Sequence, residues 1–327
     1  MVTKIIETLL TIGIGVAAAG ALYFVLDRFA VVLPGAWEDR LKPYLYLLPV
    51  IVIVAVFVLY PAILTVEYAF GNADSTALVG LKNFSSLLGS HDFQQTLINT
   101  LLWIIVAPIA SIIIGLVVAT LVDRLRPRGE KTAKTIIFLP MAIGAVGAAT
   151  IWKFVYATVP QGQNQIGLQN AIWTKLGGNP VNWVAQQNWH FNDFELIIMF
   201  LWGQVGFSMV LLSAAIKGVP TDTIEAARVD GASELQIFRS VIVPQIRPTV
   251  ITVFITVLIG VMKIFDVIYV MTNGSFNTNV IGVEFYNQLF TNQDNGKASA
   301  IVVLLMIAVI PVMVYQVRHF RLQEKAR

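Results

Sequence analysis

Two charged residues, Lys263 and Asp266, lie inside a long apolar segment and have the clearest chemical consequence in this sequence. An unpaired charge in a membrane costs roughly 3 kcal/mol on insertion scales. A spacing of three residues places both side chains on one face of a helix, where they can pair. We therefore expect either a structural ion pair or two charges that face a water-filled path.

Other polar side chains lie in or beside apolar segments and have two open interpretations. Each can line a path for a polar solute or form a hydrogen bond with a neighbouring helix, and helix bonding is the simpler interpretation for any single amide. The candidates for a solute path are Asn99, Gln204, Lys263, Asp266, Tyr269 and Asn287.

The sequence contains no catalytic or nucleotide-binding motif that we can identify. It has no G-x-x-x-x-G-K-[ST] phosphate loop, no G-x-S-x-G nucleophile elbow and no cysteine. Its three histidines, His91, His190 and His319, lack metal-ligand spacing. We therefore predict that the chain is not an enzyme and binds no cofactor or metal of its own.

A polar loop, residues 217–249, separates two apolar segments and carries helix-capping signals. Ser233 and Gln236 have the spacing of a capping box, and Asp222 with Glu225 form an acidic variant of it. Gly231 can adopt the left-handed conformation that ends a helix. These signals predict two short helices, and a helix of about nine residues is marginal in water unless it packs against something else.

The apolar segments around this loop predict an all-α polytopic membrane protein. Hydrophobic residues make up 57% of the chain and charged residues 13%, about half the usual charged share of a soluble domain. Apolar runs of about twenty residues are long enough to cross a bilayer. The seven expected spans are 6–26, 45–65, 97–122, 132–156, 195–216, 250–272 and 298–318.

Lysine and arginine positions predict the orientation of these spans. If the polar loop is cytoplasmic, sixteen basic residues lie on the inner side and four on the outer side, which follows the positive-inside rule. The N-terminus is then outside and the C-terminus inside. The net charge of +3 does not suggest nucleic-acid binding, because the basic residues lie at span ends.

Residues 1–26 can also be interpreted as a signal peptide, because Lys4 precedes an apolar run with small residues. Cleavage there would leave Arg28, Arg40 and Lys42 on the outer side, against the charge distribution. An uncleaved first span fits better.

The segment 225–244 resembles the EAA loop of ABC-importer membrane subunits. In that pattern three residues separate Glu-Ala-Ala from Gly, and nine residues separate this Gly from Ile-x-Leu-Pro. A capped helix pair in an ordinary loop would not reproduce this spacing. The matching positions are Glu225, Ala226, Ala227, Gly231, Val241, Val243 and Pro244, with two valines in place of Ile and Leu. The coupling residues that the resemblance implies are Glu225, Ala226, Ala227, Asp230, Gly231 and Pro244.

Residues 262–300 resemble the larger membrane subunit of maltose-type sugar importers, and most of all the α-glucoside permeases. A Gly-Gly-Pro of that family is replaced here by the stretch 273–276, which weakens the transfer of residue roles at this loop. The matching positions are Phe265, Asp266, Thr272, Gly274, Tyr286, Phe290, Gly296, Ala298, Ser299 and Ala300. With the polar loop, the resemblance covers roughly residues 45–320.

The resemblance implies a permease domain over residues 45–327, preceded by an additional transmembrane helix and cytoplasmic linker over 1–44. It also implies a bacterial inner-membrane location, a second permease subunit, two ATPase subunits that use ATP and Mg²⁺, and an extracytoplasmic sugar-binding protein. The expected cargo is an α-glucoside disaccharide such as maltose, trehalose or sucrose. The alternatives are import of a polyol or glycerol phosphodiester, and a membrane scaffold without a transport cycle.

Overall fold

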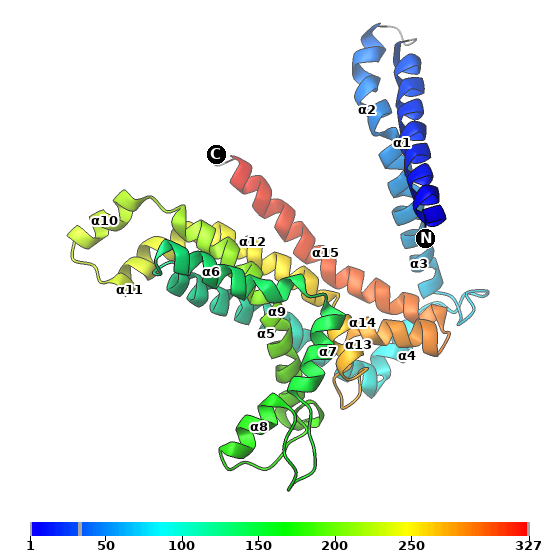
Figure 1. The fold of residues 1–327 in the computed structure, drawn as a ribbon. Coiled ribbons are helices and arrows are strands. Elements are labelled where there is room, and N and C mark those ends of the chain that lie inside the picture. Colours follow the sequence, from blue (N-terminus) through cyan, green and yellow to red (C-terminus); the bar gives the residue numbers. More distant parts are fainter. Residues whose placement is uncertain (1, 32–34, 326–327) are drawn as a thin grey trace. The chain divides into compact units, whose positions relative to one another are not determined.

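The computed structural model describes residues 2–31 and 35–325. In these ranges the regular secondary structure is helical, and the exception is one isolated bridge between Gly71 and Leu78. The all-α prediction is confirmed (Figure 1). The chain divides into two compact units, Met1–Glu67 and Tyr68–Arg327.

The first unit contains α1 (Val2–Val31), α2 (Gly35–Val54), a π-helix (Ala55–Leu59) and most of α3 (Tyr60–Ala69). The Tyr46 hydroxyl on α2 donates a hydrogen bond to Asp27 Oδ1 on α1 at 2.5 Å. The π-helix directly precedes Tyr60 and Pro61, and proline cannot donate the usual backbone bond to the carbonyl four residues earlier.

The second unit contains the remaining helices, most of which carry labels in Figure 1. They are α4 (Lys82–Gly89), α5 (His91–Val122), α6 (Pro127–Phe138), α7 (Ala145–Val155), α8 (Leu168–Lys175), α9 (Phe191–Lys217), α10 (Thr221–Val229), α11 (Glu234–Ile237), α12 (Val243–Met262), α13 (Asp266–Met271), α14 (Ile281–Tyr286) and α15 (Asn295–Lys325). Two further π-helices, Phe238–Ile242 and Asn287–Thr291, follow α11 and α14.

Six helices in the described ranges are long and apolar enough to cross a membrane, and a bent pair brings the number to seven. The six are Ile6–Arg28, Lys42–Ala69, His91–Val122, Asn188–Lys217, Glu234–Met262 and Asn295–Arg318. The chain is therefore a multi-pass membrane protein, as the apolar runs predict.

Two of the expected spans differ in shape from the prediction. The segment 132–156 is not one straight helix, because Pro127–Ala142 and Ala145–Val155 meet at 101°. Gly144 lies in an extended conformation at this bend. The segment 250–272 is also interrupted, since α12 ends at Met262 and a separate helix begins at Asp266.

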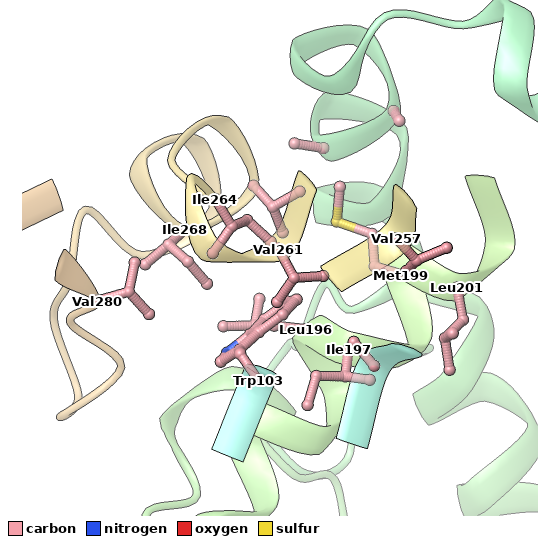
Figure 2. Close-up of a cluster of buried hydrophobic side chains, with 14 of the residues drawn as sticks. Trp103, Leu196, Ile197, Met199, Leu201, Val257, Val261, Ile264, Ile268 and Val280 are labelled. Carbon is pink, nitrogen blue, oxygen red and sulfur yellow. The ribbon is translucent and has the colours of Figure 1, made fainter. Parts of the chain in front are cut away.

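The core of the second unit lies among α5, α9, α12 and α13. Trp103 of α5, Leu196 of α9 and Ile268 of α13 are completely buried, and Val261 at the end of α12 lies among them (Figure 2). Elsewhere the long helices expose large apolar side chains, for example Ile105 and Ile113 of α5. This is the pattern expected for helices that face lipid.

Small residues allow α5, α6 and α9 to approach closely. A Cβ at Gly115 of α5 would lie 2.7 Å from the Ser208 Cβ of α9, and one at Gly206 would lie 2.6 Å from the Ile137 carbonyl oxygen of α6. The buried hydroxyls of Ser111 and Ser208 also form a hydrogen bond of 2.8 Å between α5 and α9. Such contacts are typical of helix packing in membranes.

Candidate functional site

The polar loop folds into a helical hairpin of α10 and α11 (Figure 1). Gly231 has a φ of +80°, the left-handed conformation that the sequence predicts. The Gly231 N–H donates to the Arg228 carbonyl and the Ala232 N–H donates to the Ala227 carbonyl, both at 3.0 Å. These two bonds form a Schellman motif, which satisfies the last carbonyls of α10.

The start of α11 has the predicted capping box. The Ser233 N–H donates to Gln236 Oε1 at 2.7 Å, and the Gln236 N–H donates to Ser233 Oγ at 3.4 Å. The N-cap expected at Asp222 is wrong, because α10 begins at Thr221 after Pro220. Asp222 lies instead in the first turn, where its negative charge interacts favourably with the positive end of the helix dipole.

An exposed ion pair joins the two short helices. Arg228 Nε and Nη2 donate to Glu234 Oε1 and Oε2 at 2.8 and 3.2 Å. The hydrogen bond with Glu234 raises the pKa of Arg228, whose guanidinium is charged in either case. Both side chains are more than half exposed, so solvent screens the pair and it orients the hairpin more than it stabilises it.

The outer surface of this hairpin offers groups to another molecule. Glu225 and Asp230 are exposed, and the apolar side chains of Val229 and Leu235 are 87% and 66% exposed. Ile237, by contrast, is buried and anchors the end of α11. An acid beside unburied apolar side chains, on helices too short to be stable alone, is suited to a partner's groove.

Pro244, the last residue of the motif, lies at the start of α12. Only Val243 separates it from the π-helix Phe238–Ile242. Proline has no N–H, and its ring would clash with the carbonyl four residues earlier, so a widened turn accommodates it. The hairpin therefore joins α12 through a deformed turn.

A network of charges joins the C-terminal ends of α5 and α9 to the first turns of α6, and the spacing of residues in the sequence does not reveal it. Asp123 Oδ1 accepts from Lys134 Nζ at 3.1 Å and from Ser213 Oγ at 2.7 Å. Glu130 accepts from Lys134 at 2.6 Å and also from Lys217. The sequence indicates only its basic residues, because the partners of Asp123 lie 11 and 90 positions away.

The predicted shared helix face of Lys263 and Asp266 is wrong. Lys263 follows the last residue of α12, with φ −111° and ψ 19°, and Asp266 is the first residue of α13. No ion pair joins the two side chains in the described part of the chain. The helix is interrupted between them, so the spacing of three no longer aligns them.

The interruption is shaped by close contact with α14. A Cβ at Gly282 would lie 2.5 Å from the Ile264 carbonyl oxygen, so only glycine allows this approach. A pocket of about 370 Å³ opens beside the interruption and is mainly apolar. Its lining includes Lys263, Phe265, Tyr286 and residues of α15.

Four aromatic rings extend from this pocket along α13 and α14. Ring centroids lie 4.9 Å apart for Phe265 and Tyr269, 4.9 Å for Tyr269 and Tyr286, and 4.8 Å for Tyr286 and Phe290. The Tyr269 hydroxyl donates to the Tyr286 hydroxyl at 3.5 Å. The cluster offers apolar ring faces together with polar hydroxyls.

The other predicted path residues lie in different places. Asn287 directly follows Tyr286, but Gln204 lines a separate pocket of about 170 Å³ at the bend between α6 and α7. Asn99 is completely buried and donates to the carbonyls of Asn277 and Asn279 at 2.7 and 2.9 Å. Its amide therefore holds the loop between α13 and α14, which neither the solute path nor the expected bond to a neighbouring helix describes.

Comparisons with known proteins agree with this architecture. A permease for osmoprotective compounds (GgtC) of Synechocystis is 43% identical over 86% of this chain and all of its own length. An α-glucoside permease (AglF) of Rhizobium meliloti is 40% identical over 86% of this chain and 83% of its own.

A solved bacterial ABC transporter that imports the acidic polysaccharide alginate has the same fold. Its TM-score is 0.75, with 22% identity, and the match covers 88% of this chain and 99% of that one. The family model for inner membrane components of binding-protein-dependent transport systems matches residues 111–321, which include the α10–α11 hairpin and the interrupted helix. The chain therefore belongs to the family of binding-protein-dependent transport system inner membrane components.

Proposed function

We propose that this permease imports a neutral sugar of the α-glucoside class. The observation that carries the proposal is the 40% identity with the α-glucoside permease of Rhizobium meliloti. The aromatic cluster beside Lys263 supports it, because ring faces and hydroxyls suit a molecule with both apolar and hydroxylated surfaces. Tyr269, Tyr286 and Asn287 are the residues we assign to the sugar path.

The α10–α11 hairpin is proposed to dock on an ATPase subunit. Its exposed Glu225, Val229 and Leu235 form the contact surface, and Gly231 fixes the angle between the helices. The complete importer then contains a second permease, two ATPase subunits and an extracytoplasmic binding protein. Binding of the sugar-loaded protein outside and closure of the ATPase subunits inside are linked reciprocally, so each favours the other.

The proposed orientation places the hairpin in the cytoplasm and the loop around Asn164 outside. The chain has no cysteine, so one introduced thiol reports its own position. A cysteine at Gln163 should react with an impermeant maleimide only from outside, and one at Gln323 only from inside. The reverse pattern would contradict the orientation.

The experiment that tests the function is reconstitution with the partner subunits in proteoliposomes. Maltose, trehalose or sucrose, presented on the cognate binding protein, should stimulate ATP hydrolysis and enter the vesicles. Glu225→Ala should abolish the stimulation, whereas Asp222→Ala removes another exposed acid of α10 and should have little effect. Absence of any sugar-stimulated hydrolysis would favour a scaffold.

Import of osmoprotective compounds is a second candidate, supported by the 43% identity with the Synechocystis permease. The same assay separates the two candidates. If polyols or other osmoprotectants stimulate hydrolysis and the disaccharides do not, the α-glucoside proposal is wrong and this candidate replaces it.

A further inference from the structure

A second cavity, of about 460 Å³, lies among α4, the start of α5, α14 and the loop 272–280. Its lining is mostly polar, unlike that of the apolar pocket beside Lys263. The groups that could bind a ligand include Ser86, Asp92, Asn277, Glu284, Gln288 and Lys297. In the proposed orientation, all of these lie on the outer side.

One wall of this cavity has an unusual backbone. Asn273, Gly274, Phe276 and Asn277 all have φ between +52° and +76°. Asparagine tolerates this left-handed region, but the bulky Phe276 is strained in it, and such a residue persists only where its surroundings hold it. Strain of this kind clusters at ligand clamps and other functional sites.

Two helices and the loop itself hold this strained wall. Besides the bonds from Asn99, Asn192 Nδ2 of α9 donates to the Phe276 carbonyl at 2.7 Å. Inside the loop the hydroxyls of Thr272 and Thr278 are 2.6 Å apart. The fold therefore keeps this wall in one conformation before any ligand arrives.

The charges in the cavity indicate the class of ligand. Glu284 accepts from Asn279 Nδ2 at 2.7 Å and from Gln288 Nε2 at 2.8 Å, so both of its oxygens are oriented. Lys297 pairs with Asp294 at 3.3 Å, which leaves no excess of positive charge to attract an anion. Hydroxyl groups both donate and accept, so they match this mixture of carboxylates, amides and an ammonium group.

The cavity shares α14 with the aromatic pocket. Glu284 and Gln288, four residues apart, face the polar cavity, whereas Ile281 and Phe285 line the apolar pocket. One short helical segment therefore forms a wall of both sites. A ligand in the outer cavity lies next to the proposed sugar path, separated from it by α14.

We propose that this cavity is an outer binding site that receives a neutral polyhydroxylated ligand before it reaches the aromatic pocket. The inference rests on the proposed sugar import. It adds a polar site built from α4, α14 and the loop 272–280.

Cysteine protection tests this inference, with the full importer in sealed vesicles and cysteine-free partner subunits. Ser86 lines the cavity, whereas the adjacent Ser85 is exposed outside it and provides the matched control. An impermeant maleimide should label both Ser86→Cys and Ser85→Cys from outside. Without ATP and binding protein, the sugar that supports uptake should protect Ser86→Cys alone. At ten times the half-protecting concentration its labelling should slow about tenfold, because one site in about eleven is empty.

Glu284→Gln, tested in the Ser86→Cys background, should raise the half-protecting concentration about fivefold to tenfold, because a charge-assisted hydrogen bond becomes a neutral one. The inference is overturned if the sugar gives no protection, if Ser85→Cys is protected equally, or if neither cysteine is labelled from outside. Protection by choline or glucuronate instead of the sugar would overturn the assignment to a neutral ligand. Uptake with binding protein is measured separately, so sugar import can stand when this inference fails.

Discussion

Replacing Gly231 with valine tests whether the shape of the α10–α11 hairpin couples the permease to its ATPase. Gly231 has φ +80°, and no atom lies within 4 Å of the position that a Cβ would occupy. The added side chain therefore meets no neighbour, and the whole penalty comes from the backbone conformation. For a β-branched residue that penalty is about 1–3 kcal/mol. Since 1.4 kcal/mol is a factor of ten, the correct hairpin becomes roughly fivefold to more than a hundredfold less populated relative to other conformations of the loop.

Gly231→Asn is the matched control, because asparagine tolerates the left-handed region far better than valine does. Sugar-stimulated ATP hydrolysis in proteoliposomes should remain near normal for Gly231→Asn and fall about fivefold or more for Gly231→Val. Membrane insertion should be equal in both, and co-purification of the ATPase should weaken only for valine. If Gly231→Val transports at the wild-type rate, the hairpin angle does not transmit the coupling and this reasoning is refuted.

Three further changes test other parts of the molecule. Gly282→Ala places a Cβ 2.5 Å from the Ile264 carbonyl oxygen and should lower thermal stability in detergent. Gly260→Ala is the control, because its Cβ meets nothing within 4 Å and should leave thermal stability unchanged. Lys263→Ala and Asp266→Ala should have additive effects on uptake, because the interrupted helix separates the two side chains. A strongly non-additive effect in the double variant would contradict this separation. Asp123→Ala removes an acceptor shared by Lys134 and Ser213 and should lower thermal stability. Glu234→Ala should lower it less, because the ion pair of Glu234 is exposed. Equal losses of stability would contradict the importance of the charge network.

The sequence predicts the hairpin well because its interactions are local. Gly231, Ser233 and Gln236 act on backbone groups within six positions, so their types and spacing are sufficient. The N-cap expected at Asp222 is two residues too late, because Pro220 takes the N-cap position instead. The spans were located by composition, which needs no knowledge of contacts.

The interrupted helix and the strained loop could not be predicted in the same way. Residues 250–272 are apolar almost throughout, so their hydropathy indicates one span and hides the interruption after Met262. Asn99 contacts Asn277 across 178 positions of sequence, and no spacing rule connects them. For this reason an amide expected beside a solute path or a neighbouring helix was found to hold a loop instead.

The small residues between α5, α6 and α9 have a mechanical consequence. Sliding of one helix along another would push side chains into the backbone at Gly115 and Gly206, where even a single added carbon does not fit. Shear between these three helices is therefore blocked, and during a transport cycle they should move as one rigid body. The movement must then be taken up elsewhere, and the bend at Gly144 and the interruption after Met262 are the places where the backbone can act as a hinge.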